Sequence, residues 1–214
     1  MEIESKMKPM SYHESIATIC AEQALSRFYP KGAMVVMAGD DSDTVYFIQE
    51  GELKVCAYGD DGKEVIFNVL VAGESFGELA VFTCEPRSAD VVCRTPCKLM
   101  VLKKSDYLDA LRSNADLAIA ALEYQAHLVY RLAEQVSSLA LVNVFGRVSR
   151  LLKNRGVAME EGLVIEGLTH QDIASEVGAS REMVSKILSD LNKGDYIHTQ
   201  RKRIVLLKPL PKGW

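Results

Sequence analysis

The sequence predicts an α+β protein, in which a β-rich barrel or jelly roll is followed by one long helix and a smaller C-terminal unit. Short apolar or alternating runs, separated by Gly and Asp turns, fill residues 33–102, a pattern typical of closed β architectures. A helical pattern without Pro or Gly then extends from about residue 115 to 142. The chain of 214 residues is long enough for one large domain or two small ones.

The β region is predicted to contain six strands, with glycines in the turns between them. The predicted strands are residues 33–36, 44–49, 52–58, 64–71, 89–94 and 97–102. The turn glycines are Gly32, Gly39, Gly51, Gly62 and Gly73, each at a position that favours positive φ. Before these strands, helical spacing of apolar residues predicts a helix over residues 12–28.

The long helical pattern places apolar side chains on one stripe. They are Leu117, Ala121, Tyr124, Leu128, Leu132, Val136, Leu139 and Val142. Covering the β region is one use for such a stripe, but a helix of roughly 28 residues reaches about 42 Å, more than one small barrel needs. We therefore expect this helix to pair with the same helix of a second subunit. A shorter helix over residues 106–112, capped by Ser105, is predicted before it.

Residues 76–89 combine the groups that a small phosphosugar site requires. Gly77 lets the backbone approach a ligand, and the carboxylate of Glu78 accepts hydrogen bonds from sugar hydroxyls. The planar fork of Arg87 meets two phosphate oxygens at once, while Ser88 and backbone N–H groups fill other acceptor positions. The alternative for this stretch is an ordinary β-turn-β segment with a surface Glu and Arg.

The order of these parts, Phe-Gly-Glu-Leu followed by Pro-Arg-Ser-Ala, resembles the phosphate-binding cassette of cyclic-nucleotide-binding domains. Nearly the whole chain resembles the CRP/FNR family of bacterial transcription regulators. The resemblance implies that a small effector, cAMP or cGMP, binds in the jelly roll. Its ribose and cyclic phosphate would be held by Gly77, Glu78, Leu79, Arg87 and Ser88.

The expected base contacts differ from those of cAMP-responsive relatives, which present a Thr-Ser pair on the central helix. This chain has Leu132 and Ala133 at the matching positions. A different base site is expected from Phe67, Asn68, Leu128, Arg131 and Leu132. The alternative is a family member that binds no cyclic nucleotide and either senses haem, redox state or another small molecule, or acts constitutively. Cys84, Cys93 and Cys97 are the thiols that a redox response would use.

Residues 168–191 have the pattern of a helix-turn-helix. Thr169 and Ser180 stand at N-cap positions, and Gly178 supplies the turn. The apolar inner faces consist of Ile173, Ala174, Val177, Val184, Ile187, Leu188 and Leu191. We expect the second helix to meet base edges in a major groove through Arg181, Glu182 and Lys186. Phosphates would be held by Thr169, His170, Gln171 and Ser180. The alternative is a solvated helix face with incidental charges.

The end of the chain predicts a β-hairpin wing, with strands over residues 194–198 and 201–207. Arg201, at its basic tip, is the candidate phosphate contact. Charge agrees with this division of roles, since residues 143–214 hold 12 Lys and Arg against 8 Asp and Glu, and residues 1–142 hold 13 against 21. Only the basic C-terminal part is suited to nucleic acid.

Three parts are therefore predicted. Residues 1–114 form a cyclic-nucleotide-binding-like jelly roll, residues 115–142 a dimerisation helix, and residues 143–214 a winged helix-turn-helix domain. The resemblance implies a homodimer that reads a double-stranded DNA palindrome and contacts RNA polymerase. Effector binding would then shift the paired central helices and reorient the two recognition helices.

Composition argues against several other classes of protein. No apolar run approaches the roughly 20 residues of a membrane span and no signal-peptide pattern is present, so we expect a cytoplasmic protein without membrane attachment. The five cysteines form no CxxC pair and no N-terminal cluster, which argues against a disulfide framework or an iron–sulfur centre. The four histidines lack metal-ligand spacing. We therefore expect no catalytic residues, no metal and no required cofactor.

Overall fold

The computed structural model describes residues 24–60, 62, 64–200 and 202–211 of the chain. These residues form two compact units. The first comprises the chain up to Ala57 together with Asn68–Arg131, and the second comprises Tyr58–Phe67 and the chain from Leu132 onward.

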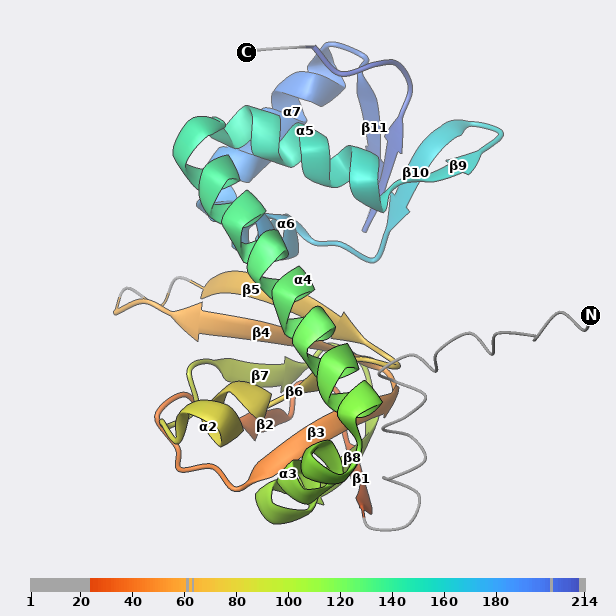
Figure 1. Cartoon of the computed structure of the whole chain (residues 1–214). Helices are drawn as coiled ribbons and strands as arrows, with labels where there is room; N and C mark the ends of the chain where they lie inside the picture. Colours follow the sequence, from red (N-terminus) through yellow and green to blue (C-terminus); the bar gives the residue numbers. More distant parts are fainter. Residues whose placement is uncertain (1–23, 61, 63, 201, 212–214) are drawn as a thin grey trace, which may run out of the picture. The chain divides into compact units, whose positions relative to one another are not determined.

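Two four-stranded sheets make up the β region (Figure 1). One has the order β1-β8-β3-β6, formed by Leu25–Tyr29, Cys97–Lys103, Thr44–Glu50 and Ser75–Phe76. The other has the order β2-β7-β4-β5, formed by Met34–Val36, Asp90–Cys93, Glu52–Tyr58 and Glu64–Val71. Neighbours such as β3 and β8, or β4 and β7, pair antiparallel. This is the jelly-roll arrangement that the alternating sequence predicts.

Strand β8 illustrates how the sequence specifies this packing. Cys97, Leu99 and Val101 are buried while the two residues that alternate with them are partly exposed, so every second side chain points into the core. Across the other sheet, Leu53 of β4 is fully buried in the same cluster. The five turn glycines all adopt positive φ, as predicted.

The predicted helix over residues 12–28 is wrong at its C-terminal end, and residues 12–23 lie outside the described part of the chain. Leu25–Tyr29 forms strand β1, paired along its length with β8 from Cys97 to Val101. Leu25 and Phe28 are 63% and 76% exposed, so their apolar side chains do not form a buried helical face. Pairing with an existing strand overrides the local helical spacing here.

The described residues of the first unit form all or part of the helices α2 (Glu78–Thr83), α3 (Lys104–Ser113) and α4 (Ala115–Leu141). The predicted cap of α3 is wrong, because the helix begins before Ser105, and the Ser105 hydroxyl donates to Oδ1 of Asp106 at 2.9 Å. Leu117 and Ala121 of α4 pack into the core beside α3. Farther along α4, Val129 and Tyr130 are 65% and 75% exposed.

The second unit contains α5 (Val144–Arg155), α6 (His170–Val177), α7 (Arg181–Lys193) and a sheet of order β11-β12-β10-β9. Its strands are Ile197–Gln200, Arg203–Leu206, Gly162–Glu166 and Val157–Met159. The core joins Leu152 of α5, Ile173 of α6 and Leu188 of α7 to Ile204 of β12. The predicted α+β class, with its helix-turn-helix and hairpin wing, is confirmed.

Candidate functional sites

The turn from β6 into α2 brings the backbone close to a buried arginine. Gly77 has φ 94°, in the left-handed region that glycine adopts without strain. A Cβ at this position would collide with Nη1 of Arg87 and lie 3.1 Å from the carbonyl oxygen of Thr44. Gly77 is therefore required both by its dihedral angle and by the space that Arg87 occupies.

Arg87 is 7% exposed and is held by acceptors of its own chain. Its Nη1 donates to the carbonyl of Gly77 at 3.0 Å. Its Nη2 donates to the carbonyl and hydroxyl oxygens of Thr44 at 2.8 and 3.0 Å. The guanidinium also lies over the ring of Tyr46, 5.7 Å from its centroid. Burial lowers the pKa of Arg87, although nearby carboxylates oppose the effect.

Glu78, the first residue of α2, is a buried acid whose carboxylate is only partly satisfied. Its exposed fraction is 3%, and its Oε1 accepts from Nε2 of Gln125 at 2.8 Å. Its Oε2 has no hydrogen-bond partner among the described residues. Burial raises the pKa of Glu78, against the opposing effects of its backbone N–H, Gln125 and Arg87. A ligand hydroxyl would supply the donor that Oε2 lacks.

Helix α4 is tied to the segment around β6 by three side chains. The hydroxyl of Tyr124 donates to the carbonyl of Ser75 at 3.1 Å, and burial raises the pKa of this phenol. Gln125 bonds Glu78, and Arg131 forms an ion pair with Glu74 at 3.5 Å. The helix therefore contacts the segment that leads into α2 at several points along its length.

The structure brings together Gly77, Glu78 and Arg87 of the predicted effector residues. Leu79 and Ser88 are exposed. Asn68 and Leu128 are half-buried in the first unit, where Arg131 pairs with Glu74. Phe67 and Leu132 fall in the second unit. The sequence did not point to Thr44, Tyr46 or Gln125, since nothing local marks a residue that contacts Arg87 or Glu78 from more than forty positions away.

The thiols differ in their surroundings. Cys56, Cys93 and Cys97 are buried. Burial, together with the Cys97 thiol, raises the pKa of Cys93 to about 12. Cys84 is exposed and ends α2 with φ 58°, and its sulfur accepts from Nζ of Lys104 at 3.3 Å.

The two helices of the helix-turn-helix begin at the predicted caps. The Thr169 hydroxyl accepts from the Asp172 backbone N–H at 3.1 Å, and Oδ2 of Asp172 accepts from the Thr169 backbone N–H at 2.8 Å, completing a capping box. Oγ of Ser180 accepts from the backbone N–H of Met183 at 3.2 Å. Gly178 ends α6 with φ 62°. Short-range hydrogen bonds thus fix where α6 and α7 begin and end.

The predicted DNA-contact side chains lie on the surface of the second unit. Those exposed to solvent are His170, Gln171, Ser180, Arg181, Glu182 and Lys186, while Thr169 is half-buried. His170 bonds Ser185 of α7 through Nδ1 at 2.9 Å. A groove of about 540 Å³ lies between the starts of these helices and the wing, and Arg181, Lys202 and His170 line it. Arg201 lies outside the described residues.

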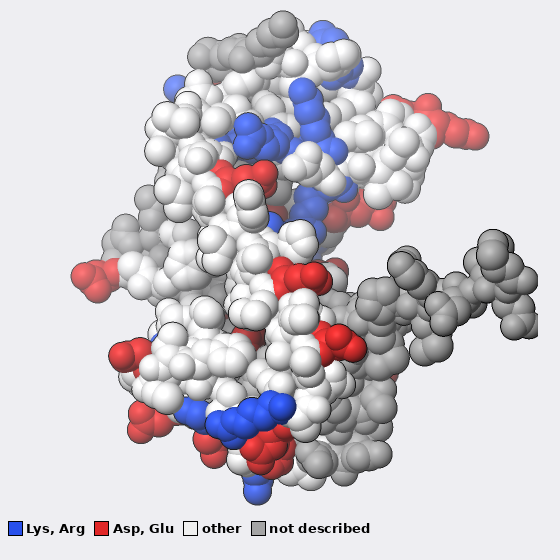
Figure 2. All heavy atoms as spheres, in the orientation of Figure 1, with Lys and Arg blue, Asp and Glu red and all other residues white. Residues whose placement is uncertain are grey.

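The view in Figure 2 shows several Lys and Arg side chains of the second unit close to one another. Within the described part of the chain, no three His, Cys, Asp or Glu residues are grouped as metal ligands. No described helix is both long and apolar enough to cross a membrane.

Together, the jelly roll with its buried Glu78 and Arg87 and the capped helix-turn-helix define a DNA-binding protein that carries a candidate ligand site. Comparison with known proteins supports both the ligand-site assignment of the jelly roll and the DNA-binding assignment of the helix-turn-helix. Residues 26–114 match the model of the cyclic nucleotide-binding domain, and residues 146–210 match the Crp-like helix-turn-helix domain.

Relatives of similar length are transcription regulators. The cAMP-activated global transcriptional regulator CRP of Haemophilus influenzae is 32% identical over 184 residues, covering 83% of this chain and 82% of the relative. The cAMP-activated regulator Vfr of Pseudomonas aeruginosa is 29% identical over 189 residues, covering 84% and 88%. The chain belongs to the CRP/FNR family of transcription regulators.

A solved structure shares the fold. The c-di-GMP-responsive global regulator CLP of Xanthomonas campestris superposes with a TM-score of 0.83 and 24% identity, covering 91% of this chain and 98% of that one. At this level of identity the likeness concerns the fold.

Proposed function

We propose that the chain is a homodimeric regulator that binds a DNA palindrome and responds to a small effector bearing a phosphate and hydroxyl groups, namely a cyclic nucleotide. The observation that carries the effector proposal is the buried pair of Glu78, with one unsatisfied carboxylate oxygen, and Arg87. A cyclic nucleotide supplies both a hydroxyl donor and an anion within the span of one small site.

In this proposal, Glu78 accepts from a ribose hydroxyl and Arg87 meets the phosphate, beside Gly77. The Nε–H and one Nη1–H of Arg87 are not used by the acceptors described above, so they are the donors assigned to the anion. Leu79 and Ser88 would complete the sugar-phosphate side from their exposed positions. The base side is assigned to Phe67, Asn68, Leu128, Arg131 and Leu132.

DNA reading is assigned to α7. Arg181 would bond a guanine edge and Glu182 a cytosine amine, with Lys186 one turn farther along. Thr169, His170, Gln171, Ser180 and Arg201 would contact phosphates. In a dimer paired through residues 115–142, two such helices about 34 Å apart would match successive turns of DNA. The exposed apolar residues of α4, including Leu122, Val129 and Val136, support that pairing.

The same proposal divides the chain into a sensor over residues 1–114, the dimer helix, and a DNA-binding domain over residues 143–214. RNA polymerase is the proposed partner at the promoter, and the cytoplasm the proposed location. Catalysis has no role in it.

A second candidate is a regulator that responds to another signal or acts constitutively. Two observations favour it. Leu132 and Ala133 replace the hydroxyl pair of cAMP-responsive relatives, and three of the hydrogen bonds of Arg87 go to its own chain. The exposed Cys84 beside the cassette is the thiol that a redox response would involve.

Calorimetric titration with cAMP, cGMP and c-di-GMP separates the two candidates. We expect micromolar binding of one nucleotide, lost in Arg87→Leu and retained in Arg112→Leu. Arg112 is the matched control because its pair with Asp109 is on the surface, where it is 71% exposed. Binding that survives Arg87→Leu, or no heat from any nucleotide, would remove the cyclic-nucleotide assignment and favour the second candidate.

The DNA assignment is tested separately, by selecting duplexes from a random pool and measuring affinity for the selected palindrome. Arg181→Gln should cost about 1–3 kcal/mol on that palindrome and relax preference at one base pair in each half-site. Lys193→Gln, at the far end of α7, is the control and should leave base preference unchanged. Equal base preference in Arg181→Gln and the parent protein would contradict this role.

A further inference from the structure

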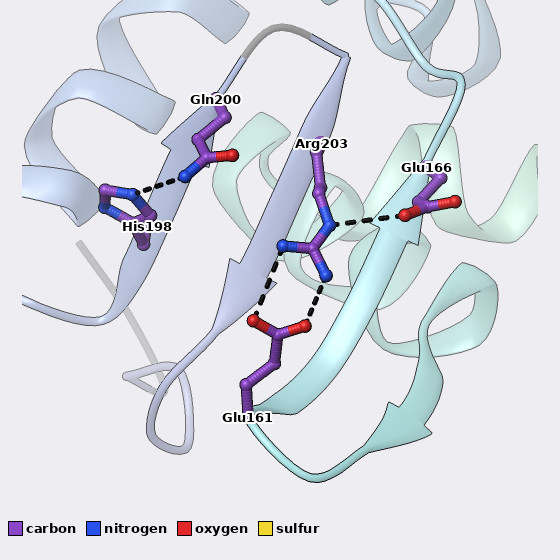
Figure 3. Close-up of polar contacts among 5 residues, drawn as sticks. All are labelled: Glu161, Glu166, His198, Gln200 and Arg203. Atoms are coloured by element: carbon purple, nitrogen blue, oxygen red, sulfur yellow. Dashed lines mark hydrogen bonds and ion pairs between the residues drawn. The ribbon is translucent and has the colours of Figure 1, made fainter.

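One arginine of the wing is surrounded by carboxylates (Figure 3). Arg203, the first residue of β12, pairs in register with Glu166 on β10. Its Nε donates to Oε1 of Glu166 at 3.2 Å. Its Nη1 donates to Oε2 of Glu161 at 3.4 Å, and its Nη2 bonds Oε1 of the same carboxylate. We call Arg203, Glu161 and Glu166 the wing clamp.

The wing clamp lies beside the groove described above, which Arg203 and Lys202 both line. Lys202 is exposed and occupies the turn between β11 and β12 with φ 57°. On the other side of Arg203 in the sheet, Gln200 pairs in register with it. Although Gln200 and Arg203 are paired through their backbones, the side-chain amide of Gln200 contacts Nε2 of His198 at 3.3 Å (Figure 3). Arg203 and Lys202 therefore line the same groove, and Arg203 is bonded there to two carboxylates.

Charge in the wing clamp favours exclusion of an anion. Two carboxylates face one guanidinium, so the cluster carries a net negative charge, and all three nitrogen atoms of Arg203 already donate to an oxygen. These bonds use three of the five N–H groups of Arg203, and a DNA phosphate that approached the remaining Nη1–H and Nη2–H would be repelled by both carboxylates. Both carboxylates are partly exposed, at 48% and 64%, so they lie at the surface that a duplex would approach.

We propose that Glu161 and Glu166 withhold Arg203 from the DNA backbone, so that of these two groove cations only Lys202 contacts phosphate. The wing clamp thereby lowers the affinity of the protein for DNA of arbitrary sequence. This inference rests on the DNA-binding role of the second unit proposed above.

The test measures affinity of the full-length protein for a short duplex of random sequence, by fluorescence anisotropy from about 50 to about 200 mM KCl. Each phosphate neutralised contributes about 0.9 to the slope of log K against log salt. Lys202→Gln should make the slope shallower by about one, whereas Arg203→Gln should leave it unchanged. The double variant Glu161→Gln/Glu166→Gln should make the slope steeper by about one and bind about tenfold tighter at the lowest salt.

Two controls separate release of Arg203 from a general loss of negative charge. Glu160→Gln/Asp195→Asn removes the same number of charges from exposed positions of the same unit and should not change the slope. Adding Arg203→Gln to the Glu161→Gln/Glu166→Gln variant should return the slope to that of the parent protein.

The wing clamp is refuted if Arg203→Gln alone makes the slope shallower by about one, or if Glu161→Gln/Glu166→Gln behaves like its charge-matched control. A parent protein that fails to bind any duplex overturns the proposed DNA-binding function instead. Binding by the parent protein, with an unaltered slope in Glu161→Gln/Glu166→Gln, overturns only the proposed role of the wing clamp.

Discussion

Arg87 in the first unit and Arg203 in the second are both held by acceptors of their own chain, but those acceptors differ. Arg87 bonds the carbonyls of Gly77 and Thr44, together with a hydroxyl, in a buried position. Arg203 bonds two carboxylates at the surface, which raise its pKa, with the hydrogen bond to Glu161 the largest cause. The acceptors of one arginine are neutral oxygens, and those of the other are carboxylates.

This difference indicates what each arginine is able to bind. Carbonyl oxygens orient a guanidinium without removing its charge, so an anion that reaches Arg87 still meets a cation. Carboxylates cancel the charge, so Arg203 offers little attraction to a phosphate. Counting basic residues therefore misrepresents both sites, because the partners of an arginine decide whether its charge is available.

The largest expected effect comes from removing Arg87. Arg87→Ala leaves buried acceptors at Gly77 and Thr44 without donors and should lower the free energy of unfolding of the first unit by about 2–4 kcal/mol. Arg203→Ala should leave the unfolding transition unchanged. Amide hydrogen exchange, resolved by unit, measures both. Equal losses in the two variants would break the contrast between the arginines.

Next in size is the effect of neutralising Glu78, which depends on pH. Its pKa is raised by burial above the ordinary value of 4.5, so the folded state binds the proton more tightly than the unfolded state does. The stability of the parent protein should therefore fall as pH rises from about 4.5 through the raised pKa. Glu78→Gln should remove this decline and be more stable by about 1–3 kcal/mol at neutral pH.

Chemical denaturation of both proteins between pH 4 and pH 8 checks the Glu78 prediction. At the acidic end the two should agree, because the carboxyl is then neutral in the parent protein too. A constant difference across the range would mean that the change acts through packing and not through titration.

A smaller loss of stability is expected from substitution of Gly77, where the cost of positive φ can be measured separately from the steric clash with Arg87. Gly77→Ala should cost about 1–2 kcal/mol from its positive φ, plus a further loss from displacing Arg87. Gly73→Ala is the matched control, because Gly73 has φ 92° but a Cβ there meets nothing within 4 Å. Equal unfolding midpoints for the two variants would show that Arg87 moves aside without loss.

The smallest effect concerns the local caps of the second unit. Thr169→Ala removes the hydroxyl of the capping box and should cost about 1 kcal/mol of unfolding free energy, seen in hydrogen exchange of α6. Thr199→Ala, in β11, serves as the control. No loss in Thr169→Ala would mean that tertiary packing, not the cap, fixes the start of α6.

The sequence predicted best the features that depend on near neighbours. Strands β4 and β5 and the caps at Thr169 and Ser180 occur at the predicted positions, because alternation and capping act within a few residues. The end of the N-terminal helix was wrong because pairing with β8, some seventy residues away, makes Leu25–Tyr29 a strand.

The same limit applies to the sites. Gly77, Glu78 and Arg87 were recognisable because their order within one short stretch suits a phosphosugar. Thr44, Tyr46 and Gln125, which hold and orient them, come from other elements and have no local pattern. The carboxylates around Arg203 were missed for the same reason, since Glu161 lies 42 residues before it.

The exposed thiol of Cys84 provides a site for chemical labelling of the sensor. Its thiol is exposed at the end of α2, three residues before Arg87, whereas Cys56, Cys93 and Cys97 are buried. In a Cys20→Ser background, a maleimide dye should label the native protein at Cys84. The fluorescence of that dye would report movement of α2, and it would do so for an effector of any chemical class that moves this helix.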